Sequence, residues 1–170
     1  KLNGKGSDLS KMVAFESMMS VTGANADERY PVRPGDELKV ALAIANVLSS
    51  KGVAIPADAQ ASVSAHRPEL VAREIGMTDG GDKIRKVAEE LLRNRGRSVV
   101  VAGGLSSKTS NALALQVAAN LLNSVLGNEG VTVDGSSVLP SRAGFAGLRK
   151  LIVDMRAGRV GALVIWGTNP

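Results

Sequence analysis

The spacing of apolar residues predicts five helices along the chain. In each segment the apolar positions recur three and four residues apart, which is the repeat of a helix with one buried face. Asp36 can cap the first helix, Pro68 suits the first turn of the second, and Gly76 ends that second helix. The five predicted helices cover Asp36–Ser50, Pro68–Ile75, Ile84–Leu92, Leu113–Val125 and Leu148–Met155.

Short apolar runs between these helices predict strands. They are Lys11–Phe15, Ser98–Ala102, Val131–Val133 and Ala162–Trp166. The run Ser98–Ala102 is short and almost wholly apolar, which is typical of a central parallel strand covered on both faces. The stretch 18–35 shows no sustained periodicity and is predicted to be a polar loop, whereas the stretch 53–65 is predicted to be a linker of small residues.

The order of strands and helices predicts an α/β fold. Parallel neighbouring strands need right-handed crossover connections, and helices of these lengths supply them. We therefore expect a three-layer Rossmann-like open sheet, mostly parallel, with helices on both faces. A chain of 170 residues with 44% hydrophobic and 22% charged residues is ordinary for one soluble domain, so residues 1–170 are expected to form a single domain.

Composition excludes several kinds of chemistry and partner. The sequence has no cysteine, which removes thiolate metal sites, iron–sulfur ligation and cysteine nucleophiles. No run approaches the roughly 20 apolar residues of a membrane-spanning helix, so direct membrane insertion is not expected. The net charge is +5, but Glu89 and Glu90 interrupt the most basic stretch, 83–97, as on the polar face of a helix. With four aromatic residues there is little surface for base stacking, and nucleic acid is not an expected partner.

Candidate ligand sites lie where the predicted strands end. In open parallel sheets, ligands bind beyond the carboxyl ends of the strands, where helix N-termini present free N–H groups. This rule selects Glu16–Ser17 with the loop that follows them, the turn Gly103–Ser110, the stretch Val133–Ser137 and the terminal Gly167–Pro170.

The turn Gly103–Ser110 matches no complete phosphate-binding motif. A Walker loop requires glycine one and six residues before its lysine, and before Lys108 those positions hold Ser107 and Ala102. A general anion pocket stays open as a hypothesis, which would make the chain a stand-alone nucleotide- or anion-binding module. The alternative is that a serine of the turn only caps the helix that follows.

Isolated polar residues give no catalytic or metal site. His66 is the one histidine, and its place before Arg67 and Pro68 at a helix start is typical of a surface histidine rather than of a catalytic triad. Asp79 and Asp82 lie in a turn where aspartate commonly caps helices, and they show no metal-ligand spacing. We therefore predict no catalytic residue and no metal ligand.

Three motifs follow one another in a recognisable order. Residues 24–29, Ala-Asn-Ala-Asp-Glu-Arg, precede Val-Arg-Pro-Gly-Asp-Glu at 32–37; Val-Val-Val-Ala-Gly-Gly at 99–104 precedes a long helix; and the chain closes on Trp-Gly-Thr-Asn-Pro at 166–170. Together they resemble the molybdopterin oxidoreductase family, with its Arg-Pro-Gly-Thr-Asp helix start, its later strand–glycine–helix unit and its Gly-x-Asn-Pro signature. Read with Phe15–Ser17 and Ser20–Asp27, they look most like the large iron–sulfur subunit of the quinol-oxidising alternative complex III.

The resemblance implies which residues would form a cofactor site. In cofactor-bearing relatives the matching positions would line molybdopterin guanine dinucleotide through backbone N–H groups and one carboxylate. The family aspartate that receives the guanine falls on Glu37, and the alternative complex III branch is not expected to hold the cofactor, so none is expected in this chain. The positions carried over are Arg33, Pro34, Gly35, Glu37, Gly103, Gly104, Gly167 and Asn169.

The resemblance also implies a setting. Cysteines for an iron–sulfur cluster and a molybdenum ligand would lie upstream, so the chain is expected to be a fragment of a larger oxidoreductase subunit. Its expected role is that of a structural domain, inactive alone, in an electron-transport complex on the periplasmic side of a bacterial membrane. The expected partners are the remaining domains of the parent subunit and other subunits of the complex. The same motifs leave open a dinucleotide-binding domain of an active molybdoenzyme.

Overall fold

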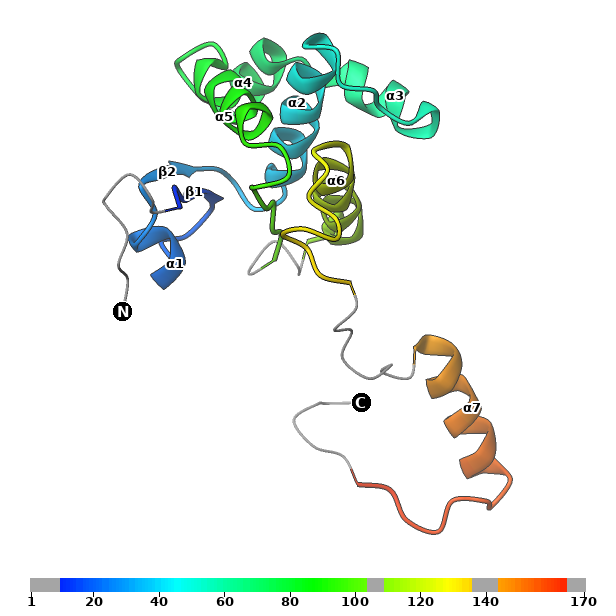
Figure 1. Cartoon of the computed structure of the whole chain (residues 1–170). Helices are drawn as coiled ribbons and strands as arrows, with labels where there is room; N and C mark the ends of the chain where they lie inside the picture. The colour runs from blue at the N-terminus through cyan, green and yellow to red at the C-terminus, as the bar shows by residue number, and fades with distance from the viewer. Residues whose placement is uncertain (1–9, 104–108, 136–143, 165–170) are drawn as a thin grey trace, which may run out of the picture. The chain divides into compact units, whose positions relative to one another are not determined.

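The computed structural model describes residues 10–103, 109–135 and 144–164. The chain divides into two compact units, Lys1–Asp134 and Gly135–Pro170, which we describe separately. The single domain cut from a larger subunit stays a prediction. In the described residues the fold is mixed α/β, with helices predominating over one small parallel sheet (Figure 1).

Helix α2 (Glu37–Ser50) is the centre of the core in the first unit. It packs against α3 (Ala57–Ala65), α4 (Pro68–Ile75), α5 (Asp82–Arg93) and α6 (Ala112–Val125). Alanine on the buried face of α2 keeps the helix thin, which lets several neighbours approach it closely. Its buried apolar side chains are Val40, Ala41, Ala43, Ile44, Ala45, Val47 and Leu48.

Glycines end α4 and precede α5, and the first of them confirms the predicted end of α4. Gly76 follows α4 with φ +80°, the left-handed conformation that glycine adopts at helix C-termini. Gly81 precedes α5 with φ +91°, and a Cβ atom there would lie 2.7 Å from the carbonyl oxygen of Pro68. Only glycine therefore lets the start of α5 approach the start of α4 this closely.

The sheet consists of β1 (Val13–Glu16) and β2 (Glu28–Pro31), which pair in parallel. Val13 is opposite Glu28, and Phe15 is opposite Tyr30, with the two ring centroids 5.1 Å apart. The first predicted strand is thus confirmed. The prediction of a loop over 18–35 is wrong, because α1 (Val21–Ala24) and β2 both fall within it.

Three further predictions are corrected by the structure. Residues 53–65 are not a linker throughout, because α3 begins directly after Pro56 on a run of helix-favouring alanines, although it buries only Val63. Residues 98–102 pair with no strand, so the central strand predicted there is absent from the described sheet. The predicted strand Val131–Val133 is reduced to an isolated bridge between Glu129 and Val133.

The second unit contains α7 (Phe145–Arg156), which confirms the last predicted helix. Ala157 caps the C-terminal end of the helix, and Gly158 follows with φ +67°. Residues 162–164 form no strand, and the rest of the strand predicted there, like the terminal motif, lies outside the described residues. Across the described ranges, no helix has the length and apolar character needed to cross a membrane.

Candidate functional site

Two of the loops predicted to hold a ligand meet in the first unit. The side-chain amide of Asn111, at the start of α6, donates to the carbonyl oxygen of Gly35 over 2.8 Å. Thr109 Oγ1 donates to Asn111 Oδ1 over 2.7 Å. The loop that follows β2 and the end of the turn Gly103–Ser110 are therefore joined directly, and the N-termini of α2 and α6 lie together.

The N-terminus of α2 already carries two carboxylates of its own. Glu37 is only 8% exposed, and its Oε2 accepts a hydrogen bond of 2.6 Å from the backbone N–H of Gly35. Asp36 is 9% exposed and lies 2.9 Å from the ammonium group of Lys39. The positive end of the α2 dipole is thus compensated within the chain. Gly35 adopts φ +96°, which a residue with a side chain would hold only under strain.

The remaining predicted site residues contribute little to a pocket. Arg33 and Pro34 are exposed, and an added Cβ at Gly103 would meet no atom within 4 Å. Gly104, Gly167 and Asn169 lie outside the described residues. The described part of the site does not fit the pyrophosphate of a dinucleotide, because its buried side chains are the carboxylates of Asp36 and Glu37, and like charges repel.

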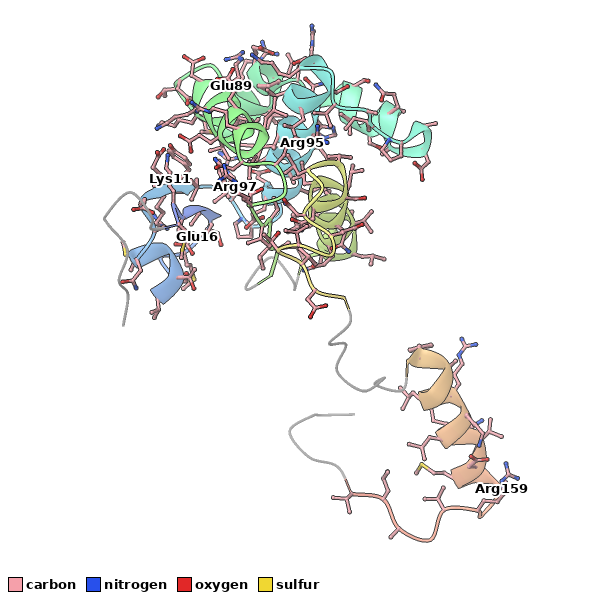
Figure 2. The ribbon with its side chains drawn as sticks, in the orientation of Figure 1. Lys11, Glu16, Glu89, Arg95, Arg97 and Arg159 are labelled. Carbon is pink, nitrogen blue, oxygen red and sulfur yellow. The ribbon has the colours of Figure 1, made fainter. Side chains whose placement is uncertain are left out.

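Glu16, at the carboxyl end of β1, is held by its surroundings. Its carboxylate accepts hydrogen bonds from Ser20 Oγ at 2.6 Å and from Arg29 Nε at 2.6 Å, and these bonds lower the pKa of Glu16. Gly23 of α1 lies against the same carboxylate with no room for a Cβ atom. In Figure 2, Glu16, at the end of β1, lies on the side of α1, and Lys11, just before β1, lies on the side of α5. The arrangement holds α1 over the end of β1 and engages the Glu16 carboxylate on both oxygens.

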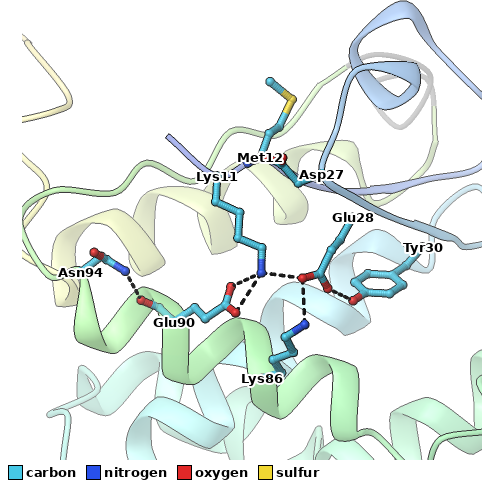
Figure 3. Close-up of polar contacts among 8 residues, drawn as sticks. All are labelled: Lys11, Met12, Asp27, Glu28, Tyr30, Lys86, Glu90 and Asn94. Carbon is cyan, nitrogen blue, oxygen red and sulfur yellow. Dashed lines mark hydrogen bonds and ion pairs between the residues drawn. The ribbon is translucent and has the colours of Figure 1, made fainter. Parts of the chain in front are cut away.

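A charged cluster that sequence reasoning missed connects the strands to α5 (Figure 3). Lys11 Nζ lies 2.5 Å from Glu28 Oε1 and 2.8 Å from Glu90 Oε2. Lys86 Nζ lies 2.8 Å from the same Glu28 oxygen, and the hydroxyl of Tyr30 donates to Glu28 Oε2. We call these five residues the Lys11 cluster. Only the spacing of Lys86 and Glu90, one helical turn apart, was visible in the sequence.

The Lys11 cluster shifts the pKa values of its members in compensating directions. Hydrogen bonds from Lys11 and Lys86 lower the pKa of Glu28 to about 2. Burial, followed by the hydrogen bond to Glu28, raises the pKa of Tyr30 to about 12. The pKa of Lys11 is raised by Glu28 and Glu90. Each charge faces a partner, so the cluster ties elements together and holds no group poised to exchange protons near neutral pH.

Amide side chains of α6 take the place of a neighbouring strand beside residues 98–102. Asn123 Oδ1 accepts from the N–H of Val100 at 2.9 Å, and Asn123 Nδ2 donates to the carbonyl oxygen of Val100 at 2.7 Å. Two turns earlier, Gln116 Nε2 donates to the carbonyl oxygen of Ala102 at 2.8 Å. Asn123 is 5% exposed and also accepts from Asn128. Backbone groups of Val100 and Ala102 are therefore bonded to side chains of α6 rather than to a neighbouring strand.

A cleft of about 350 Å³ is lined by residues of α2, α4 and α5, but its charges are largely paired. Lys51 Nζ lies 2.9 Å from Glu89, and Arg85 is bonded to Glu69. Only Arg67 contributes a cation without an ion pair among the described residues, and it is exposed. The lining therefore carries three cations and two carboxylates, and its one excess positive charge, on Arg67, is exposed.

No metal centre forms within the ranges that the structure describes. His66 ends α3, with Nδ1 at 2.7 Å from the carbonyl oxygen of Ser62. Asp79 accepts from the N–H groups of Gly81 and Lys83 at the start of α5, so its predicted capping role is confirmed.

Comparison with known proteins gives no assignment. No protein-family model matches the chain, and no curated protein is significantly similar to it. The resemblance to molybdopterin oxidoreductases therefore stays a prediction.

Proposed function

We propose that the chain is a Rossmann-like domain of a molybdopterin oxidoreductase-like subunit, and that it serves as a structural domain in a quinol-oxidising electron-transport complex. In this proposal the domain positions the rest of the parent subunit and other subunits on the periplasmic side of a bacterial membrane. It performs no redox chemistry of its own and holds no molybdopterin guanine dinucleotide.

The contact between Asn111 and Gly35 supports a dinucleotide-site ancestry. A strand followed by a helix N-terminus is the unit from which dinucleotide sites are built, and here two helix N-termini lie together. The loops involved are those that carry the first and second motifs of the resemblance. A site assembled at this place would therefore draw on both.

The observation that carries the structural role is the conformation of Glu37. Its carboxylate is buried and bonded to the N–H of Gly35, two residues earlier. A guanine base would need that carboxylate to face the ligand, and a pyrophosphate would need the Gly35 N–H to be free. The two groups satisfy each other instead, which favours a domain that has kept the architecture of the site and lost its ligand.

The proposal is tested on the intact parent subunit. A tagged parent would be purified from its native membranes in mild detergent, and its iron, molybdenum and acid-released guanine nucleotide would be measured together with quinol oxidation. We expect co-purifying subunits, iron and quinol oxidation, with neither molybdenum nor guanine nucleotide. A stoichiometric molybdenum content would instead support the active molybdoenzyme, and a parent that purifies alone, without iron, would contradict both.

A separate measurement addresses the anion-binding module. Thermal unfolding of the 170-residue chain would be followed with ATP, GDP and pyrophosphate, and we expect no stabilisation. Stabilisation by ATP that is lost in Lys108→Ala and kept in Lys150→Ala would favour the module at the turn Gly103–Ser110. Lys150 is a suitable control because it lies in the second unit and pairs with Asp154.

A further inference from the structure

The basic residues of α5 and of the turn that follows it fall into two groups. Those in the first half of the helix are engaged by other side chains, in the pairs Lys83–Tyr30, Arg85–Asp82, Arg85–Glu69 and Lys86–Glu28. Arg93, Arg95 and Arg97 are exposed and have no carboxylate partner in the described part of the chain. Three guanidinium groups without a counter-charge therefore lie within five residues.

The carboxylates nearest to these arginines in the sequence are engaged elsewhere. Glu89 Oε1 lies 2.9 Å from Lys51 Nζ, and Glu90 Oε2 lies 2.8 Å from Lys11 Nζ. Both carboxylates of the last turns of α5 thus neutralise lysines of other segments. Arg93, one helical turn after Glu89, is left without an ion pair within the described ranges.

The remainder of the chain is poor in carboxylates that could cover the arginines. The second unit contains one acidic residue, Asp154, which pairs with Lys150 and Arg159. Among the residues outside the described ranges, Asp8 is the one acidic residue of the sequence. Three guanidinium groups therefore exceed what these parts of the chain supply, wherever they lie.

The turn that carries the arginines is fastened to the C-terminal end of α6. The N–H of Gly96 donates to the carbonyl oxygen of Leu126 at 3.0 Å, and Arg95 Nη2 donates to the carbonyl oxygen of Val125 at 3.1 Å. A guanidinium group has five N–H donors, so Arg95 keeps four for another acceptor. Because the turn is already ordered, a ligand of the arginines orders little backbone when it binds.

We propose that Arg93, Arg95 and Arg97 bind an acidic segment of a partner polypeptide through its aspartate and glutamate carboxylates. The planar fork of a guanidinium group matches the two oxygens of a carboxylate, and such charge-assisted pairs are the stronger hydrogen bonds. The partner segment therefore carries several carboxylates close together in its sequence.

Nucleic acid fits these arginines less well than an acidic polypeptide. A phosphate backbone needs basic groups along an extended surface, whereas residues Lys1–Asp134 hold 16 lysine and arginine residues against 15 aspartate and glutamate residues. Base stacking needs aromatic side chains, and the sequence has none between Tyr30 and Phe145. The positive charge at this turn is local, which suits a short acidic segment.

A second copy of the chain is also a poor occupant. Asp58 and Glu129 are exposed carboxylates without an ion pair in the described ranges, but they are single charges on separate parts of the chain. Neither would face three guanidinium groups at once. The inference goes beyond the proposed function, because it follows from unpaired charges and holds whether or not the chain belongs to a redox complex.

The test is a chemical-shift titration of the isotope-labelled 170-residue chain. The probe is a short capped peptide that alternates glutamate and serine, and the matched probe has glutamine in place of glutamate. We expect the glutamate peptide to shift the Nε–Hε resonances of the three arginines and the amide of Gly96, and the glutamine peptide to shift none of them. Added salt should weaken the binding.

Two double variants with the same loss of charge separate the turn from the rest of the surface. Arg93→Gln with Arg97→Gln removes no side-chain hydrogen bond of the turn, and it should raise the dissociation constant about tenfold. Arg67→Gln with Arg73→Gln is the matched control, because both residues are exposed and have no ion pair in the described ranges. The control should leave the dissociation constant unchanged.

Three results would overturn the proposal. Equal weakening by the two double variants would show that net charge alone attracts the probe. Absence of shifts with the glutamate peptide at low salt would show that the arginines only compensate the C-terminal ends of α5 and α6. Tighter binding of an oligothymidylate with the same number of charges, lost in Arg93→Gln with Arg97→Gln, would assign the turn to nucleic acid.

Discussion

The backbone N–H and C=O groups of the first unit find their hydrogen-bond partners in different ways in the helices and in the extended segments. Helix α2 bonds its backbone within itself and offers buried apolar side chains to four neighbouring helices. In the described part of the chain the segment 98–102 pairs with no strand, and the side chains of Asn123 and Gln116 bond to its backbone. Among the residues that the structure describes, β1 and β2 pair only with each other, and ion pairs join Lys11 and β2 to α5.

This difference shows which part of an α/β domain can form from a local stretch of chain. A helix closes its hydrogen bonds over four residues, whereas a strand needs a second chain segment to complete its own. The helical layer should therefore carry most of the stability, and the extended segments should depend on a few polar side chains. Four predictions test that division.

The largest effect is expected from the helical core. Leu48 is fully buried in α2, and Leu48→Ala should lower the free energy of unfolding by about 3 kcal/mol, through lost burial and the cavity left behind. Leu113→Ala on exposed α6 surface should cost less than about 0.5 kcal/mol. Urea unfolding followed by circular dichroism measures both. Equal effects would show that the helical layer is not the stable part.

Removal of the Asn123 side-chain amide, which bonds to the backbone of Val100 as a neighbouring strand would, should have the next largest effect. Asn123→Ala leaves the N–H and C=O of Val100 without their partners, which should cost about 2 kcal/mol. Gln116→Ala, which removes one exposed hydrogen bond to Ala102, should cost less than about 0.5 kcal/mol. Hydrogen exchange should increase at Val100 in the first variant only. An unchanged Val100 amide in Asn123→Ala would show that the segment is supported by other contacts.

A smaller effect is expected from the Lys11 cluster, with a defined pH dependence. The pKa of Glu28 is about 2 in the folded chain and 4.5 without its partners, so its stabilising contribution is complete above pH 4.5 and is lost as the pH falls towards 2. Because the cluster is partly exposed, Glu28→Gln should cost at most about 1 kcal/mol at neutral pH. The difference between wild type and variant should shrink below pH 4.5 in urea titrations.

Glu129→Gln is the matched control for that titration. Glu129 is exposed, and its carboxylate has no ion pair within the described ranges. The control should follow wild type at every pH. A difference between wild type and Glu28→Gln that stayed constant from neutral pH to pH 2 would contradict the assigned role of the ion pairs.

The smallest expected change is spectroscopic. The chain has one tyrosine, so phenolate absorbance in an alkaline titration reports Tyr30 alone. Its midpoint should lie near 12, and any contribution of the neutral phenol to stability is present below pH 10 and lost as the pH rises through 12. Glu28→Gln should lower the midpoint while burial keeps it above 10. A midpoint of 10 in wild type would show that β2 does not hold Tyr30 as described.

The sequence predicted the helices well because their information is local. The apolar repeat and the flanking Asp36, Pro68 and Gly76 mark where α2 and α4 begin or end, and the structure has these boundaries. The predicted cap by Asp36 is corrected, because its side chain makes no capping hydrogen bond and pairs with Lys39 instead. The helix over Ala57–Ala65 was missed because its residues are small and only Val63 is buried, so no apolar stripe marks it. The mixed α/β character was also predicted, and the Rossmann-like arrangement of the sheet stays a proposal.

The extended segments and the site could be predicted only in part. Apolar composition identified 98–102 as extended, but composition does not specify a partner, and an asparagine 23 residues later took that place. The rule that ligand loops gather at strand ends anticipated the meeting of Gly35 with the turn that ends near Asn111. The inward conformation of Glu37 was not predictable, because it depends on the left-handed backbone at Gly35.

The Lys11 cluster makes the attachment of the strands sensitive to the ionic medium. Charges that attract one another across about 3 Å in a partly exposed setting weaken as the Debye length falls from about 8 Å at physiological salt to about 3 Å at 1 M. Helix packing around α2 has no such dependence, since apolar burial is maintained or strengthened by many salts. A higher ionic strength should thus weaken the attachment of β1 and β2 to α5 while the helical core around α2 stays intact. The strands and the helices of the first unit therefore respond differently to added salt.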